Sequence, residues 1–357
     1  MLGSRRKTML AARLHAARDI RIEEVEAPGR PGPGQVLIRV TAVGICGSDL
    51  HSYEDGRIGD TVVQQPLILG HEFAGQVLAC GDAARDGNDE PLQPGQRVAV
   101  DPAQPCLRCD LCLKGHPNLC RRLHFCGLWP DDGALCERML VPAHGCFPLP
   151  DALSDAEGAL LEPLGVALHA VDLARLRLAR SVVVLGCGPI GLLIIRLARL
   201  AGADPIYACD RFPWRAAAAR AWGAGEVWCS VEDDSIERVE QLTCGRGADV
   251  VFEAAWADES VAEAAEMARP GGKVILVGIP SADVLTMKHS TARRKGLTLL
   301  MSRRMKHTYP RSIQLAQGGG LALEDLISRR YPLVGSAEAF ASYAAWEEGV
   351  QKLLIEP

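Results

Sequence analysis

The sequence lacks a strong excess of charge of either sign, because 39 Lys and Arg residues are balanced by 44 Asp and Glu residues. The formal net charge of −5 gives no basic excess of the kind that binds nucleic acid or an anionic membrane. A long uninterrupted apolar run is also lacking. The most apolar stretch, SVVVLGCGPIGLLIIRLARLAGA, contains arginines, a proline and several glycines, whereas a membrane span needs about 20 nearly uncharged residues. We therefore expect neither nucleic acid nor a membrane among the partners of this protein.

A secretory signal is lacking as well, since the basic start MLGSRRKTML is not followed by an apolar core and a small-residue cleavage site. We therefore expect a cytoplasmic protein, in which the 13 cysteines remain reduced and disulfides do not form. At roughly 150 residues per domain, a chain of 357 residues predicts two domains.

Four of the cysteines lie close together, in the segment CLRCDLCLKGHPNLC. Short gaps separate the first three sulfurs and a longer return loop brings the fourth, which suits one tetrahedral zinc site with Zn–S distances of about 2.3 Å. Four thiolates leave no open position for a substrate, so the spacing predicts a structural metal rather than a catalytic one. Loose surface cysteines and an iron–sulfur cluster are the alternatives. The four candidate ligands are Cys106, Cys109, Cys112 and Cys120.

A second set of metal-binding side chains is scattered along the first half of the chain. Cys46 follows an apolar strand in VTAVGICGSDLHSY, and His71 and Glu72 follow another in PLILGHEFAGQV, each in a predicted turn. Glu162 lies in SDAEGALLEPLGVALHAVDLA, a segment with helical spacing, where a carboxylate among apolar neighbours must be paired, protonated or on a metal. Mixed sulfur, nitrogen and oxygen ligands with one open position are typical of a catalytic zinc. Taken singly, the cysteine also fits a core, and the other three also fit solvated positions.

The glycine-rich segment predicts a dinucleotide-binding βαβ unit. An apolar strand runs into Gly186-x-Gly188-x-x-Gly191, a helix follows with Pro189 in its first turn, and the next strand, PIYACD, ends at Asp210. Glycines let backbone N–H groups approach a pyrophosphate at the helix N-terminus, and the acid accepts hydrogen bonds from the adenosine ribose. A carboxylate there repels a 2′-phosphate and favours NAD over NADP, although an arginine beside it is able to pair with that phosphate. The candidate dinucleotide-binding residues are Gly186, Gly188, Pro189, Ile190, Gly191, Asp210, Arg211 and Arg215.

The alternation of strands and helices continues after this unit. Strand-like runs at 248–254 and 273–279 are separated by the helical segment SVAEAAEMA, as expected of a parallel sheet. A βαβ unit that binds no nucleotide is the alternative interpretation.

Taken together, these motifs resemble those of the zinc-containing medium-chain dehydrogenase/reductase family. GICGSDLH, GHE, CLRCDLCLKGHPNLC, PDDGALCE, GALLEPLGVALHA and VLGCGPIG occur in the order typical of the family, and the likeness extends from Met9 to the end. GRIGD, HFCGLWPDDG and LLEPLGVALHA are most similar to the sorbitol (polyol) dehydrogenase branch. The resemblance implies an α/β protein with a GroES-like, mostly-β catalytic domain, residues 1–165 and 303–357. A Rossmann domain with a doubly wound parallel sheet, residues 166–302, is implied between these two segments.

The resemblance also implies roles for individual residues. Cys46, His71 and Glu72 match the ligands of the catalytic zinc, and Glu162 matches a carboxylate that binds the zinc directly or through its water. Two zinc ions per chain, NAD as coenzyme and a homodimer or homotetramer are implied as well. The proton-relay and substrate-pocket positions of the family correspond to Ser48 and His51, and to Phe125 and Arg304, respectively.

The implied activity is hydride transfer between a secondary alcohol and NAD. Ser52 stands where the polyol enzymes carry an aromatic residue, Met305 where they tend to have tyrosine, and Trp256 where a small residue is usual. These departures favour a pocket for another polyol, a cyclitol or a secondary alcohol over sorbitol itself. Threonine 3-dehydrogenase or butanediol dehydrogenase activity is the alternative among enzymes. A zinc- and nucleotide-binding protein without turnover is the alternative of another class.

Overall fold

The computed structural model describes residues 7–255, 257–280 and 284–357, so Trp256 lies outside the described residues. The chain divides into two compact units, the first formed by Met1–Glu162 and Tyr309–Pro357 and the second by Pro163–Thr308. The sequence predicts the corresponding boundaries after residues 165 and 302. In the described part of the chain, no helix is both long and apolar enough to cross a membrane.

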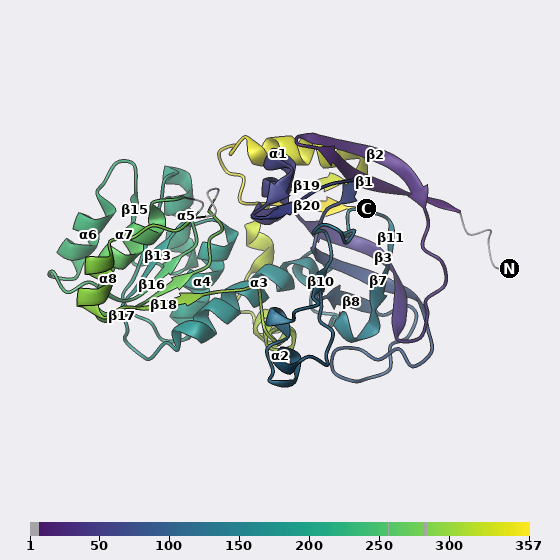
Figure 1. Cartoon of the computed structure of the whole chain (residues 1–357), viewed down its shortest axis with the longest axis horizontal. Coiled ribbons are helices and arrows are strands. Elements are labelled where there is room, and N and C mark those ends of the chain that lie inside the picture. The colour runs from purple at the N-terminus through teal and green to yellow at the C-terminus, as the bar shows by residue number, and fades with distance from the viewer. Residues whose placement is uncertain (1–6, 256, 281–283) are drawn as a thin grey trace. The chain divides into compact units, whose positions relative to one another are not determined.

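The first unit contains a large, mostly antiparallel sheet, which Figure 1 shows beside the label of the C-terminus. Its strands are β3 (Gln35–Gly44), β7 (Glu72–Cys80), β8 (Arg97–Val100), β11 (Arg138–Pro142), β12 (Cys146–Pro148), β19 (Ile327–Pro332) and β20 (Lys352–Glu356). They follow the order β12-β8-β7-β3-β20-β19, and β11 also pairs with β3. The central strand β3 is buried at most positions, which explains its run of Val, Leu and Ile.

Smaller elements complete this unit. The minor strands are β1 (Thr8–Ala16), β2 (Asp19–Glu26) and β6 (Leu67–Ile68), which form one sheet, and the pairs β4 (Arg57–Ile58) with β5 (Thr61–Val62) and β9 (Ala103–Gln104) with β10 (His124–Phe125). The helices are α1 (Gly47–Asp55), α2 (Asp110–Leu113), α9 (Tyr309–Gln317) and α10 (Ser336–Ala344), with 3₁₀ turns η1 (Pro117–Leu119), η2 (Ala143–Gly145), η3 (Leu323–Leu326) and η4 (Leu333–Gly335). Helix α3 (Asp155–Ala174) begins in the first unit and ends in the second.

The second unit is a parallel sheet covered by helices. The strands are β13 (Val182–Leu185), β14 (Ile206–Asp210), β15 (Glu226–Cys229), β16 (Ala248–Glu253), β17 (Ala268–Leu276) and β18 (Thr298–Met301). The helices are α4 (Pro189–Leu200), α5 (Pro213–Trp222), α6 (Ser235–Leu242), α7 (Ser260–Met267) and α8 (His289–Lys295). The central strands β13 and β16 are buried along their whole length, which explains the continuous apolar runs in the sequence.

The strand order in the second unit is β15-β14-β13-β16-β17-β18. The chain therefore moves outward from β13 in one direction and, after β15, returns to the centre and moves outward in the other. Right-handed crossovers then bring α4 and α5 to one face and α6, α7 and α8 to the other. The contacts agree, since α4 packs on α5, and α7 packs on both α6 and α8. This arrangement confirms the predicted doubly wound fold.

The structure differs from the sequence-based expectation around Cys46. The polar residues after this cysteine were expected in a turn, but they form helix α1. The Asp49 carboxylate accepts a hydrogen bond from the backbone N–H of Cys46 at 2.9 Å and caps the helix, which ends at Gly56 with φ +65°. The helix buries polar residues as well as Leu50 and Tyr53, so its sequence shows no simple apolar face. Glu72, also expected in a turn, is the first residue of β7.

Candidate active site and metal centres

Cys46, His71 and Glu72 converge in the first unit. One possible ligand atom from each residue, the thiol sulfur, a ring nitrogen and a carboxylate oxygen, lies within 4.8 Å of the other two. The register of the sheet explains this, because Gly44 at the end of β3 is opposite Glu72 at the start of β7. A Cβ atom on Gly44 would lie 2.2 Å from Glu72 Oε2, so the glycine makes room for this carboxylate. The donor set of sulfur, nitrogen and oxygen fits a zinc ion.

Asp49 orients the histidine of this group. Its buried carboxylate lies 3.3 Å from His71 Nδ1 and also accepts hydrogen bonds from the backbone N–H groups of Cys46 and Gly70. Burial disfavours a charged imidazole, but the neighbouring Asp49 and Cys46 outweigh it and raise the pKa of His71. A proton on Nδ1 that is shared with Asp49 leaves Nε2 as the nitrogen available to a metal. No role was predicted for Asp49 from the sequence.

Glu72 is paired with a lysine that the sequence analysis missed. Lys352 Nζ lies 2.8 Å from both carboxylate oxygens of Glu72 and donates to the carbonyl of Ile45 at 3.0 Å. Both side chains are almost fully buried. Burial alone would lower the pKa of Lys352, but the carboxylate of Glu72 raises it above the ordinary value, so the pair is ionic. The available signal was a lysine directly before the buried apolar residues Leu353, Leu354 and Ile355 of the strand.

Glu162 lies near this group without belonging to the set of atoms within 4.8 Å. It is buried in helix α3, and burial raises its pKa to about 8. The positive charges of His71 and Lys352 act to lower this pKa, whereas Glu72 acts to raise it further. A carboxyl group that titrates near pH 8 is able to accept or release a proton at physiological pH.

The other candidate residues occupy different positions. Ser48 Oγ lies 3.3 Å from His71 Nε2, and the ring of Phe125 packs against the ring of His71 with centroids 5.3 Å apart. The buried His51 lies on α1, with its Nδ1 3.9 Å from Asp55 Oδ2. Ser48 and Phe125 therefore contact His71 directly. Arg304 belongs to the second unit, where its backbone adopts φ +54°.

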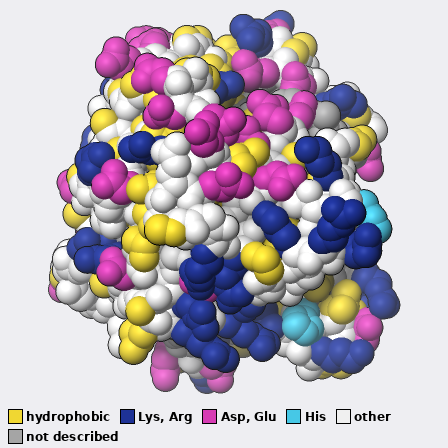
Figure 2. Space-filling view, turned by 90° about the vertical axis from the view of Figure 1, so that its left-hand side faces the viewer, with side chains coloured by type: hydrophobic (Ala, Val, Ile, Leu, Met, Phe, Trp, Pro, Cys, Tyr) yellow, Lys and Arg dark blue, Asp and Glu magenta, His cyan; other side chains and the backbone are white. Residues whose placement is uncertain are grey.

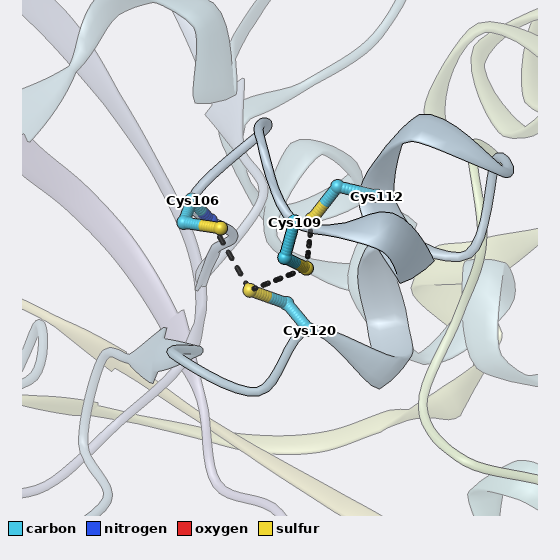
Figure 3. A group of neighbouring side chains, drawn as sticks. All are labelled: Cys106, Cys109, Cys112 and Cys120. Atoms are coloured by element: carbon cyan, nitrogen blue, oxygen red, sulfur yellow. Dashed lines mark hydrogen bonds between the residues drawn. The ribbon is translucent and has the colours of Figure 1, made fainter.

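The four cysteines of the loop form a second convergent group, which Figure 3 shows with the sulfur atoms turned toward one another. All four sulfurs lie within 4.8 Å of one another, and that of Cys109 is 3.4 Å from Cys112 and 4.0 Å from Cys120. Backbone N–H groups of Cys106 and Arg122 donate to the sulfur of Cys120. A hydrogen bond from the backbone N–H of Arg108 lowers the pKa of Cys106 to about 6, and thiolates are the form that binds metals. The set fits a closed tetrahedral site without an open position.

The glycine motif forms the predicted strand–turn–helix. Gly186 has φ +90°, and a Cβ atom on Gly191 would lie 1.9 Å from the carbonyl oxygen of Gly186, so neither position accepts a larger residue. Gly188 is the N-cap of α4, and Pro189 and Ile190 form its first turn. This motif has the narrow backbone turn and the helix N-terminus at which a pyrophosphate binds.

Asp210 ends β14 beside the same turn. Its two carboxylate oxygens accept hydrogen bonds from the backbone N–H groups of Cys187 at 2.8 Å and Phe212 at 2.9 Å. The guanidinium of Arg211 lies 4.7 Å from the ring centroid of Phe212, and that of Arg215 lies 4.9 Å from the ring of Trp214. Arg215 also reaches the glycine turn, since its Nη1 would be 3.7 Å from a Cβ atom on Gly188. The predicted dinucleotide residues are thus close together.

Comparisons with known proteins agree with this architecture. Residues 32–151 match the alcohol dehydrogenase GroES-like domain, and residues 189–318 match the zinc-binding dehydrogenase domain. The sorbitol dehydrogenase of Bacillus subtilis is 34% identical over 351 residues, which cover 98% of each chain.

Solved structures show the same likeness. The 2R,3R-butanediol dehydrogenase of Bacillus subtilis superposes with a TM-score of 0.84 at 32% identity, and a Sinorhizobium meliloti protein described as a zinc-binding dehydrogenase, bound to NADP, superposes with 0.87 at 33%. In both, the match covers 98% of this chain and 99% of the other. The chain therefore belongs to the zinc-containing medium-chain dehydrogenase/reductase family, in its sorbitol (polyol) dehydrogenase branch, and is an alcohol or polyol dehydrogenase.

Proposed function

We propose that this enzyme oxidises a secondary alcohol of the polyol or cyclitol type with NAD, at a zinc held by Cys46, His71 and Glu72. The observation that carries this proposal is the convergence of a thiol, an imidazole and a carboxylate within 4.8 Å. When bound, the zinc supplies a Lewis acid that lowers the pKa of an alcohol hydroxyl, and the nicotinamide supplies the hydride chemistry.

The side chains around the zinc ligands have distinct tasks in this proposal. Asp49 holds the tautomer of His71, and Lys352 fixes the orientation of Glu72. Glu162, with a pKa raised to about 8 by burial, accepts a hydrogen bond from a second hydroxyl of a diol or binds the metal through water. Ser48 and His51 conduct the hydroxyl proton outward. Phe125, whose ring packs against that of His71, lines the substrate site.

We also propose a structural zinc in the second group, so that each chain holds two zinc ions. Four converging thiols in a fifteen-residue loop support this assignment, because such a set coordinates the metal completely. This metal clamps the loop and has no contact with substrate.

NAD is the proposed coenzyme, in preference to NADP. The Asp210 carboxylate is fixed by two backbone N–H groups, where it favours a ribose hydroxyl and repels a 2′-phosphate. Arg211 and Arg215, which are the groups able to offset this repulsion, are stacked over the rings of Phe212 and Trp214. The Sinorhizobium meliloti neighbour is bound to NADP, so the preference between NAD and NADP has to be measured for this protein.

A homodimer or homotetramer in the cytoplasm is the proposed assembly. Strand β18 is at one edge of the parallel sheet, and its Leu299 and Met301 are exposed. An exposed edge strand with apolar side chains is a surface on which a second copy is able to pair.

A butanediol dehydrogenase is the second candidate. The structural neighbour of that name has an identity of 32%, close to the 34% of the sorbitol dehydrogenase. Threonine 3-dehydrogenase activity is the remaining alternative among these enzymes.

The test is a panel of polyols, cyclitols, 2,3-butanediol and threonine, each offered with NAD and with NADP, with reduced coenzyme followed by absorbance. Zinc is counted in the same protein. Turnover of a polyol or cyclitol with NAD and two zinc ions per chain supports the proposal. Turnover of 2,3-butanediol or threonine alone selects an alternative, and tight binding of zinc and NAD without any turnover refutes the enzyme assignment.

A further inference from the structure

A group of basic side chains lies at the amino-terminal edge of the parallel sheet in the second unit. Ser181 directly precedes β13, and Asp249 is the second residue of the neighbouring parallel strand β16. The glycine motif begins directly after the other end of β13, whose four residues span roughly 13 Å at 3.3 Å per residue. The basic group and the glycine motif are therefore at opposite edges of one sheet.

Asp249 binds three arginines at this edge. Its Oδ1 accepts hydrogen bonds from Arg180 Nη1 at 2.8 Å, Arg246 Nη2 at 2.9 Å and Arg269 Nε at 2.7 Å. Its Oδ2 accepts from the backbone N–H and the hydroxyl of Ser181. Burial would raise the pKa of Asp249, but the donors from Arg269 and Arg246 outweigh it and lower the pKa below the usual range. One permanent negative charge thus faces three positive charges.

Three more cations follow from the neighbouring backbone, since the N–H of Arg180 donates to the carbonyl of Arg177 and Lys273 pairs with Val250, the residue after Asp249. Lys273 donates to the carbonyl of Ala174 at 2.6 Å, and its pKa is lowered by burial and by the charges of Arg175 and Arg177, which lie nearby. Within the residues that the structure describes, no carboxylate lies within 4.0 Å of the guanidinium group of Arg175 or of Arg177. We name the six residues the basic cluster: Arg175, Arg177, Arg180, Arg246, Arg269 and Lys273.

Among the described residues, the carboxylates that contacts place beside the basic cluster are fewer than its cations. Besides Asp249, Asp172 lies one turn before Arg175, and Asp204 is paired with Arg199 at 2.8 Å. Six cations against Asp249 and Asp172 leave a formal excess of +4. On the face drawn in Figure 2, Lys and Arg side chains gather in the lower part, and Asp and Glu side chains are more frequent in the upper part.

The geometry favours an anion with several charged oxygens. The side chains of Arg180, Arg246 and Arg269 are 39%, 51% and 27% exposed, so N–H donors that Asp249 does not use are accessible to solvent. Guanidinium groups bind phosphoryl oxygens through two parallel hydrogen bonds. Because Asp249 already holds these arginines in place, less side-chain conformational entropy is lost when a ligand binds them. A diphosphate or triphosphate group matches the excess charge, whereas a monoanion leaves most of it uncompensated.

We propose that the basic cluster is a binding site for a small soluble molecule with a diphosphate or triphosphate group. The site is separate from the zinc ligands and from the glycine motif. Its occupancy stabilises the second unit, because the anion relieves the repulsion among the cations in the folded state only.

Inorganic pyrophosphate is the probe, titrated by calorimetry into the full-length zinc-loaded protein at low and at moderate salt, with NADH present at saturation. We expect saturable binding that weakens as salt screens the charges. Arg246→Gln and Arg177→Glu each raise the Kd by about tenfold or more, the effect of losing one charge-assisted hydrogen bond or charge. Arg85→Gln is the matched control, since Arg85 lies in the first unit and contacts Asp89.

Three results overturn the proposal. One is the absence of saturable binding at low salt. Another is binding that Arg246→Gln and Arg177→Glu leave at the wild-type Kd, because the anion is then bound elsewhere. The third is sedimentation with phosphatidylglycerol vesicles without affinity for pyrophosphate, which assigns the cluster to a lipid surface. The thermal unfolding of each variant is measured without pyrophosphate, so that a loss of folding is distinguished from a loss of binding.

Discussion

Lys352 and Glu72 form a buried ion pair although 279 positions of the chain separate them in numbering (352 − 72 − 1), with the ammonium nitrogen 2.8 Å from both carboxylate oxygens. The pair joins strand β20 to a candidate zinc ligand on β7. A buried carboxylate whose cation is removed keeps the cost of desolvation without the compensating attraction.

Lys352→Met is therefore expected to destabilise the protein by about 3–5 kcal/mol and to weaken zinc binding. Lys352→Arg preserves the charge and serves as the matched control. Chemical denaturation and zinc analysis of the two variants measure both effects. A Met variant with wild-type stability and full zinc content contradicts the proposed task of the lysine.

The pH dependence of stability depends on Glu162. Burial raises the pKa of this residue to about 8 in the zinc-free protein, from an ordinary value of 4.5. Between these two values the folded state holds a proton that the unfolded state has released, so the free energy of unfolding falls as the pH rises through this window. Glu162→Gln is expected to remove this fall.

The measurement is urea denaturation of the zinc-free protein at several pH values from about 4.5 to 8. The advantage of Glu162→Gln over the wild type grows toward the upper end of the range. Glu338→Gln, at an exposed position of α10, is the control and leaves the pH profile unchanged. Parallel profiles for wild type and Glu162→Gln contradict the assignment.

The two cysteine groups predict opposite phenotypes. Cys46→Ser is expected to abolish activity with little loss of stability, because Cys46 is a proposed ligand of the catalytic metal. Cys109→Ser is expected to lower the Tm, because a structural metal contributes directly to folding. Each variant loses one zinc ion per chain. Cys244→Ser is the control, since Cys244 is exposed and outside both groups. Two variants that fold and turn over like the wild type refute the assignment of both sites.

The sequence was most informative where the chemistry is local. The four loop cysteines lie within fifteen residues, and the glycine turn is flanked directly by its strand and its helix, so their spacing alone predicts both sites. The convergence of Cys46 with His71 and Glu72 required the pairing of Gly44 with Glu72 across two strands. The sequence showed that these three residues are of metal-binding types. Only the resemblance to a family suggested that they lie close together.

Tertiary pairing explains what the sequence could not predict. Lys352 reaches Glu72 because β20 pairs with β3, with Leu354 opposite Gly44. The pairing of these two strands, which are far apart in the sequence, cannot be predicted from a local sequence pattern. Helix α1 was predicted as a turn because its buried face includes Asp49 and His51, side chains that resemble solvated ones in a sequence.

The proposed preference for NAD over NADP depends on Asp210. Its carboxylate is held at the end of β14 by the N–H groups of Cys187 and Phe212, next to Arg211 and Arg215. Asp210→Asn removes the charge that repels a 2′-phosphate while the two arginines remain to attract it. We expect the ratio of kcat/KM for NAD to that for NADP to fall by on the order of tenfold, equivalent to about 1.4 kcal/mol. Asp233→Asn, an exposed site in the same unit, should leave the ratio unchanged, and an unchanged ratio for Asp210→Asn would mean that the arginines, not the acid, select the coenzyme.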